Sequence, residues 1–257
     1  MLLVIDAGNT NTVFAVFDGN KLIGQWRMAT DARRTADEYC VWLLQIMRHE
    51  NIEPKHIKAA ILSSVVPQAN FALRMLTRRY FNTELLIVGE PNVQLGILAK
   101  IERPREVGAD RLVNAVAAWH KYKKPMIVVD FGTATTFDIV DERGDYIGGV
   151  IAPGINLSLE ALHKAAAKLP NIAVERPFQV IGKDTVSAMQ SGVYFGYVGL
   201  IEGIVSRIKN EYGRAMDVVA TGGLAPLFAK ATPMIDALEP DLIIDGLRLI
   251  YEKNVTA

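Results

Sequence analysis

The sequence predicts an α/β protein of two lobes, each opening with a β-hairpin and a third strand and continuing with alternating helices and strands. Three observations lead to this prediction: a motif that occurs twice, the helix–strand alternation after each copy, and the length. A chain of 257 residues is long enough for two small lobes that each bury a core. Half of the residues are hydrophobic and 22% are charged, which is typical of folded rather than disordered chains.

The repeated motif is an apolar strand that ends in Asp-x-Gly followed by hydroxyl and amide residues. Residues 2–12 read LLVIDAGNTNT and residues 127–136 read IVVDFGTATT. Three pairs of residues correspond at one constant offset: Asp6 with Asp130, Gly8 with Gly132, and Thr12 with Thr136. An alternating strand, a turn and a further strand follow each motif, so each lobe is expected to open with a β-β-β unit.

Helical apolar spacing then alternates with short apolar strands, which indicates parallel pairing. The predicted helices of the first lobe are 35–49 and 68–81, and its further strands are 57–66 and 85–88. The second lobe has predicted helices 158–168, 186–211 and 241–252 and a strand at 218–220. A helix over 108–124 lies where the lobes meet, and we assign residues 1–115 to the first lobe and 116–257 to the second. The expected element order of both lobes is β-β-β-α-β-α-β-α.

Composition argues against several kinds of partner. Lys+Arg and Asp+Glu both number 28, so no net charge favours nucleic acid or an anionic membrane. No apolar run approaches the roughly 20 residues of a membrane span, and no signal-peptide pattern is present. Cys40 is the single cysteine, which fits a cytoplasmic location, and its apolar helical neighbourhood predicts a core residue. The histidines lack the spacing of metal ligands: His49, His56, His120 and His163.

The two Asp-x-Gly turns predict phosphoryl transfer. Glycine lets the backbone approach phosphate, and successive N–H groups form an anion-binding concavity, so nucleotide phosphates are expected between the lobes. Asp6 is placed to hold Mg²⁺. The expected donors are Asn9, Thr10, Asn11 and Thr12 in the first turn and Thr133, Thr135 and Thr136 in the second. Gly222 and Gly223 follow a strand and would let adenine and ribose lie against the backbone. Turn chemistry alone would explain either turn singly, but their duplication favours function.

A third candidate segment, Gly108-Ala109-Asp110-Arg111, opens a helix after Pro104. Asp110 is a candidate general base for an acceptor hydroxyl, and Arg111 is a candidate ligand for a carboxylate or phosphate. The residues alone leave another interpretation open, in which Asp110 favours the helix dipole and Arg111 forms a surface or interlobe ion pair. The chain has no Walker-type loop, protein-kinase signature or dinucleotide Gly-x-Gly-x-x-Gly.

Taken in order, the motifs resemble those of the actin, sugar-kinase and heat-shock-chaperone ATPase superfamily, and more narrowly those of the type III pantothenate kinase family. The matching segments span nearly the whole chain: residues 6–10, 64–67, 106–111, 130–136, 148–154, 188–192 and 220–225. The resemblance implies a two-lobed actin-like ATPase (ribonuclease H-like) fold with a nucleotide cleft between the lobes. It also implies ATP-dependent phosphorylation of pantothenate to 4′-phosphopantothenate, the first step of coenzyme A biosynthesis.

The same resemblance implies residue roles. Asp110 would accept the proton of the pantothenate hydroxyl. The residues implied to hold pantothenate are Gly108, Ala109, Asp110, Arg111 and Thr185. Those implied to bind ATP are Asp6, Ala7, Gly8, Asn9, Thr10, Asn11, Thr12, Val13 and Thr133. Asp130 would help to hold the monovalent cation, K⁺ or NH₄⁺, that the family requires besides Mg²⁺. Family members are homodimers, which suits the apolar helix expected at 186–208.

The chain departs from the family pattern at Ile101, where many members carry a tyrosine that approaches pantothenate. A kinase for another small hydroxy acid or sugar is therefore one alternative. A non-catalytic accessory regulator on the same fold is another. Asp6, Asp110 and Asp130 are all present, which favours an enzyme, because a regulator could tolerate their loss.

Overall fold

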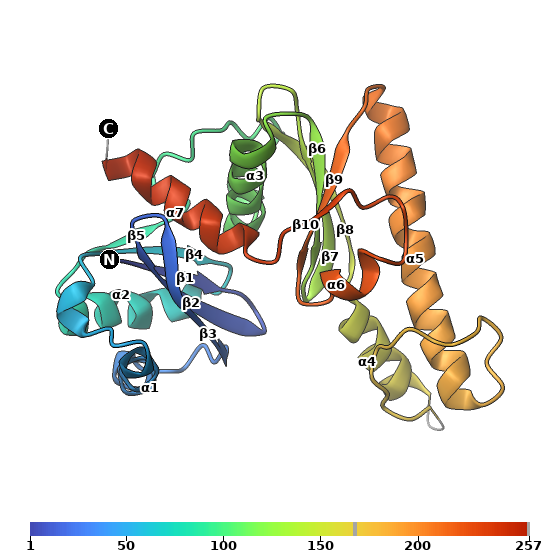
Figure 1. The fold of residues 1–257 in the computed structure, drawn as a ribbon, viewed down its shortest axis with the longest axis horizontal. Coiled ribbons are helices and arrows are strands. Elements are labelled where there is room, and N and C mark those ends of the chain that lie inside the picture. Colours follow the sequence, from blue (N-terminus) through green and yellow to red (C-terminus); the bar gives the residue numbers. More distant parts are fainter. Residues whose placement is uncertain (167–168, 256–257) are drawn as a thin grey trace. The chain divides into compact units, whose positions relative to one another are not determined.

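A computed structural model describes residues 1–166 and 169–255 (Figure 1). The chain divides into two compact units. The first unit comprises Met1–His120 together with Leu242–Ala257, and the second unit is Lys121–Asp241. The last helix therefore packs with the N-terminal part, whereas the sequence grouped residues 116–257 together.

The first unit follows the predicted element order. Its strands are β1 (Leu2–Ala7), β2 (Asn11–Asp18), β3 (Lys21–Ala29), β4 (Ala59–Ser64) and β5 (Leu85–Ile87). Its helices are α1 (Ala36–His49), α2 (Pro67–Phe81), α3 (Ala109–Tyr122) and α7 (Leu242–Val255), with short 3₁₀ turns at Pro54–His56 and Pro104–Glu106. The sheet order is β3-β2-β1-β4-β5, with β1 antiparallel to β2 and parallel to β4.

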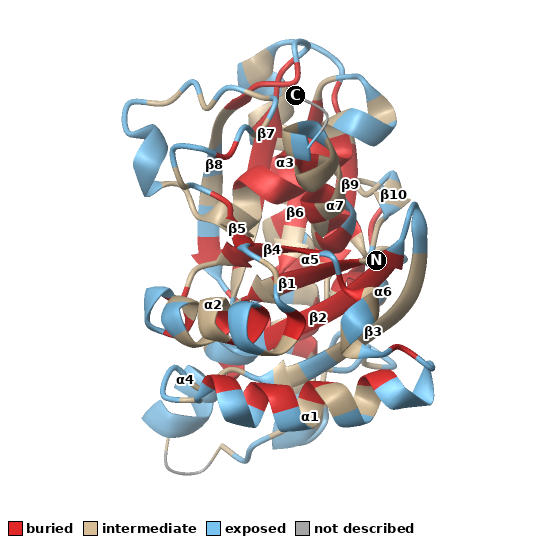
Figure 2. Ribbon diagram, turned by 90° about the vertical axis from the view of Figure 1, so that its left-hand side faces the viewer, coloured by how far each residue is buried: buried red, intermediate tan, exposed pale blue. Residues whose placement is uncertain are grey.

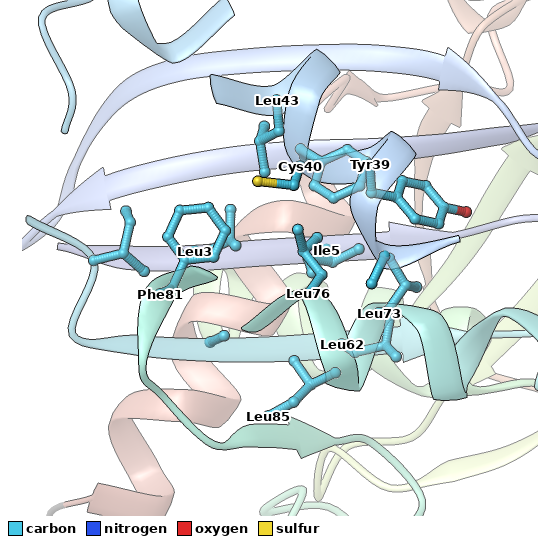
Figure 3. Close-up of a cluster of buried hydrophobic side chains, with 14 of the residues drawn as sticks. Leu3, Ile5, Tyr39, Cys40, Leu43, Leu62, Leu73, Leu76, Phe81 and Leu85 are labelled. Atoms are coloured by element: carbon cyan, nitrogen blue, oxygen red, sulfur yellow. The ribbon is translucent and has the colours of Figure 1, made fainter. Parts of the chain in front are cut away.

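Both faces of this sheet are covered, so its inner strands β1, β2 and β4 are buried (Figure 2). Alternation along β1 sends Leu3 and Ile5 to the core formed with α1 and α2, where Cys40 also lies (Figure 3). The prediction of Cys40 as a core residue is confirmed.

Leu2 and Val4 point to the opposite face of the first sheet, into a core shared with α3 and α7. Helix α7 fits against α3 there because Gly246 has no side chain. A Cβ at Gly246 would lie 2.5 Å from the carbonyl oxygen of Val113. This close packing explains why the last helix belongs to the first unit.

The second unit is built on a sheet of order β10-β9-β6-β7-β8. Its elements are β6 (Met126–Phe131), β7 (Ala134–Val140), β8 (Tyr146–Pro153), α4 (Ile155–Ala165), α5 (Thr185–Tyr212), β9 (Asp217–Gly222), α6 (Ala225–Phe228) and β10 (Ala237–Leu238). Two helices separate β8 from β9, so this unit departs from the expected order. Residue 168, where the helix predicted at 158–168 ends, lies outside the described residues.

The sheet registers confirm the duplication but correct one part of it. In the first sheet Ala7 lies opposite Thr12, and in the second Phe131 lies opposite Thr135. Thr12 is therefore equivalent to Thr135 and not to Thr136, because the first turn is one residue longer than the second. Both hairpins also have a β-bulge at equivalent places, between Val16 and Phe17 and between Ile139 and Val140. Within the described parts of the chain, no helix has the length and apolarity to cross a membrane.

Candidate active site

The first turn, Gly8–Asn11, is held by side-chain hydroxyl groups. Gly8 N donates to Asn11 O at 3.0 Å, and the Thr30 hydroxyl donates to Gly8 O at 2.7 Å. The Thr30 and Thr12 hydroxyls lie 2.8 Å apart. Asn9, Thr10 and Asn11 are exposed on the turn, whereas the side chains of Ala7, Thr12 and Val13 are buried. Thr12 therefore supports the turn instead of extending from it.

The second turn lies around Gly132 and Thr133 and is held by close backbone packing. Gly132 N donates to Ala134 O at 3.0 Å. Gly154, directly before α4, packs so closely that a Cβ there would lie 2.1 Å from Thr133 O. The Tyr197 hydroxyl of α5 anchors the start of α4 by donating to Pro153 O at 2.9 Å. The N-terminus of α4 therefore lies against the second turn.

Asp130 lies at the end of β6, beside the Gly-Gly turn that ends β9. Gly222 lies opposite Phe131 in the parallel pair and has a φ of +93°. A Cβ at Gly222 would lie 2.5 Å from Asp130 Oδ1 and 2.7 Å from Phe131 O. Glycine is required there both for its conformation and for the space beside the carboxylate.

The antiparallel neighbour of Asp130 is Thr136. Its hydroxyl donates to Asp138 Oδ2 at 3.0 Å, and the Tyr146 hydroxyl donates to Asp138 Oδ1 at 3.0 Å. Thr135 is fully buried on the other face of β7. The sequence predicted Thr133, Thr135 and Thr136 as donors on the second turn, but Thr133 is the exposed member of this set.

Asp110 lies in the first turn of α3, and its carboxylate folds back over Gly108. Arg111 N donates to Asp110 Oδ1 at 2.8 Å. A Cβ at Gly108 would lie 2.4 Å from the same oxygen and 3.6 Å from Val65 Cγ1. Burial raises the pKa of the Asp110 carboxyl group, and the N–H and guanidinium of Arg111 oppose that rise. A carboxylate with a raised pKa is a stronger proton acceptor.

Gly108, just before α3, lies near Val65, at the edge of the first sheet where β1 and β4 end. Val65 follows β4, and its N–H donates to Ala7 O at 3.1 Å. Asp110 precedes Val113 by one helical turn, and Val113 packs on the face of β1 that also carries Asp6. Asp6 and Asp110 therefore lie at one edge and on one face of the first sheet.

Ser63 is a residue of this edge that sequence reasoning missed. It is the parallel neighbour of Asp6 on β4 and is fully buried. Its hydroxyl oxygen has no hydrogen-bond partner among the described residues. A polar residue on the apolar strand Ala59–Ser64 was the available signal.

The residues predicted to hold pantothenate fall into two sets. Gly108, Ala109, Asp110 and Arg111 belong to the first unit, and Thr185 belongs to the second. Thr185 is exposed at the start of α5, where Asp184 and Ser187 form a capping box. Ile101 is partly buried just before the 3₁₀ turn that leads into α3.

Solved structures of low sequence identity share this fold. A protein described as a 2-dehydro-3-deoxygalactonokinase from Sinorhizobium meliloti is 13% identical, with a TM-score of 0.60 and 98% of this chain and 99% of that chain covered. A protein described as a Baf-family transcriptional activator from Campylobacter jejuni is 19% identical, with a TM-score of 0.59 and 99% and 100% covered. At such identities the likeness establishes the fold alone, and the predicted two-lobed fold of sugar kinases and actin-like ATPases is confirmed.

Comparison with known sequences identifies the family of this chain. The family model described as type III pantothenate kinase matches residues 2–207. Type III pantothenate kinase of Rhodospirillum rubrum is 61% identical over 254 residues, 99% of both chains, and that of Paramagnetospirillum magneticum is 62% identical over 256 residues, 100% of this chain and 98% of the relative. With matches of this identity along its whole length, the chain belongs to the type III pantothenate kinase family.

Proposed function

We propose that this protein transfers the γ-phosphoryl group of ATP to pantothenate, giving 4′-phosphopantothenate in the first step of coenzyme A biosynthesis. The observation that carries the proposal is the edge of the first sheet, where a carboxylate with a raised pKa, Asp110, shares one face with Asp6. A kinase needs a base for the acceptor hydroxyl and a carboxylate for the metal that accompanies ATP. These two residues have the chemistry for those tasks.

Asp110 acts as the base in this proposal. It accepts the proton of the pantothenate hydroxyl as that oxygen attacks the γ-phosphorus, and the bond from phosphorus to the ADP oxygen breaks. Gly108 and Ala109 hold the substrate with it, while Arg111 and Thr185 supply polar contacts. The close approach of the Asp110 carboxylate to Gly108 supports this assignment, because a side chain at position 108 would displace that carboxylate.

The nucleotide is bound by residues of both turns and of the Gly-Gly turn. The exposed residues Asn9, Thr10 and Asn11 offer donors in the first unit, together with the backbone of the segment from Asp6 to Val13. Thr133 offers donors in the second unit, where the N-terminus of α4 adds a favourable dipole for phosphate. Gly222 and Gly223 lie beside the adenine and ribose.

Asp6 holds Mg²⁺ in this proposal. Mg²⁺ in kinases is bound by one or two carboxylates together with substrate phosphates and water, so one carboxylate at a strand end suffices for the ion. Among the described residues, no group of three or more His, Cys, Asp or Glu forms a metal-binding cluster. Such a cluster is not needed for an ion that arrives with ATP. When bound, Mg²⁺ would neutralise phosphate charge, and Asp6 would hold it.

Asp130 holds the monovalent cation, K⁺ or NH₄⁺. The proposal is supported by the place of Asp130 near the end of β6, where its Oδ1 lies so close to Gly222 that a Cβ there would be 2.5 Å away. Backbone carbonyl oxygens and a carboxylate are suitable ligands for K⁺, and Phe131 O also lies close to Gly222. The cation would add positive charge near the phosphates when bound.

Homodimer formation is part of the proposal. Large apolar side chains are exposed on the segment before α5, where Phe178 is 102% and Ile181 is 71% exposed, and on α4, where Leu157 is 49% exposed. Surfaces of this kind commonly bind a second protein. We place the activity in the cytoplasm, where ATP is available.

The test is a coupled assay of ADP release with ATP and Mg²⁺, run with pantothenate and with a panel of other small hydroxy acids and sugars. We expect turnover with pantothenate in K⁺ or NH₄⁺ and little turnover in Na⁺. Preference for another acceptor would assign the enzyme to that substrate, and Ile101 is the reason to include the panel. Absence of turnover with every acceptor would favour a regulatory protein.

A further inference from the structure

The buried hydroxyl of Ser63 forms no hydrogen bond that would stabilise the fold, as far as the structure describes the chain. Ser63 is fully buried on β4, and its Oγ has no hydrogen-bond partner there. Leaving a buried hydroxyl unsatisfied costs stability, and such groups in native proteins call for an explanation. If this position served only for packing, alanine would be more favourable than serine, because alanine has no hydroxyl group to desolvate.

The neighbouring serine provides a contrast. Ser64 Oγ accepts a hydrogen bond from Val66 N at 3.1 Å, which stabilises the turn into α2. Ser64 thus has a structural task, whereas Ser63, on the opposite face of the same strand, has none. The two residues differ in contacts although their chemistry is identical.

The position of Ser63 indicates its partner. Ser63 is the register neighbour of Asp6 in the parallel β1–β4 pair, so both side chains project from the same face of adjacent strands about 4.8 Å apart. Rotation about χ1 of serine, which has three staggered positions, brings a hydroxyl at this position within reach of a carboxylate at the other.

We propose that Ser63 is a positioning residue for Asp6: when metal and nucleotide are bound, its hydroxyl donates a hydrogen bond to the Asp6 carboxylate and holds it in the orientation that ligates the metal. This inference rests on the proposed role of Asp6 as the Mg²⁺ ligand. Carboxylates that bind metals are commonly held by hydrogen bonds from a second layer of residues, and loss of such a partner weakens metal binding by about 10- to 100-fold.

The test compares Ser63→Ala with Ser64→Ala in the full chain. Affinity for Mn²⁺, as a probe for Mg²⁺, is measured by calorimetry in the presence of a non-hydrolysable ATP analogue, and the melting temperature is measured without ligands. For Ser63→Ala we expect metal affinity to fall about 10- to 100-fold, with a ligand-free melting temperature that is unchanged or higher. For Ser64→Ala we expect a lower melting temperature and unchanged metal affinity.

Asp6→Asn separates this inference from the function on which it rests. If Asp6→Asn weakens Mn²⁺ binding and Ser63→Ala does not, the role of Ser63 is overturned while the metal site stands. If Asp6→Asn leaves Mn²⁺ binding unchanged, both are overturned. A drop in the ligand-free melting temperature of Ser63→Ala equal to that of Ser64→Ala would assign Ser63 a structural role and also overturn the inference.

Discussion

The first and second Asp-x-Gly turns occupy equivalent places in their sheets but are held in different ways. Around Gly8 the support comes from hydroxyl groups, with Thr30 bonded to Gly8 O and to Thr12. Around Thr133 the support comes from backbone packing, with Gly154 and Gly222 so close that neither position has room for a Cβ.

The difference shows what the duplicated unit preserved. The strand that ends in aspartate and the β-bulge of the hairpin are common to both copies. The turn length and the supporting contacts are not. The first turn should therefore be sensitive to loss of hydrogen bonds and tolerant of added volume, and the second should have the opposite sensitivity.

The largest effect is expected at the second turn, for Gly222→Ala. The new Cβ would meet Asp130 Oδ1 and the Phe131 backbone, and alanine would be strained at a φ of +93°. We expect a loss of about 2–5 kcal/mol in the free energy of unfolding, measured by urea denaturation. Gly223→Ala is the matched control, since nothing lies within 4 Å of its Cβ position, and should change stability by less than about 0.5 kcal/mol. Equal stability of the two variants would contradict the role of close packing.

An intermediate effect is expected at the first turn, for Thr30→Val. This change removes the Thr30 hydroxyl, which is hydrogen-bonded to Gly8 O and to the hydroxyl of the fully buried Thr12. Leaving those groups unpaired should cost about 1–3 kcal/mol of unfolding free energy and raise the KM for ATP. Thr30→Ser keeps the hydroxyl and should restore most of both. If valine were tolerated as well as serine, the hydroxyl support of this turn would be disproved.

Gly8→Ala should have a smaller effect than Gly222→Ala. Gly8 is not among the glycines with positive φ, and its Cβ would lie 3.2 Å from a single backbone oxygen, that of Asn11. We expect a loss below about 1 kcal/mol in the free energy of unfolding. A loss as large as that of Gly222→Ala would mean that both turns depend on close backbone packing.

The smallest effect on stability concerns the charge at the edge of the first sheet. Burial raises the pKa of Asp110 above its ordinary value of 3.8, so the native state binds this proton more tightly than the unfolded state. Wild-type stability should therefore fall as pH rises from 3.8 through the raised native pKa. Asp110→Asn lacks this fall, so its stability relative to wild type should be higher at about pH 7 than at about pH 4. A pH-independent difference would contradict the raised pKa.

Much of the fold followed from the sequence because hydrophobic period and turn residues determine local structure. The predicted helix at 35–49 corresponds to α1, with Thr35 as its N-cap, and the paired Asp-x-Gly motifs correctly predicted two hairpins. The strand registers could not be predicted from the sequence. They depend on which residues pair across each turn, and this pairing also determines the length of the turn. The placement of α7 in the first unit could not be predicted either, because it depends on the contact between Gly246 and Val113.

Prediction of the candidate site had a similar limit. Strand ends identified Asp6, Asp130 and the glycines, because those residues interrupt apolar runs. Ser63 was missed, because its importance comes from its register neighbour and from the absence of a hydrogen-bond partner within the described residues. Thr12 and Thr135 looked like exposed donors in sequence, but the alternation of each strand turns them into the interior.

The most direct test of the proposed function is the pantothenate-dependent turnover of Asp110→Asn, measured beside its affinity for ATP. Asparagine keeps the shape of the side chain and cannot accept the proton. The proposal predicts that kcat falls about 10²- to 10⁴-fold while the Kd for Mg-ATP remains unchanged. Turnover close to that of the wild-type enzyme would contradict it, because Asp110 would then not be the base.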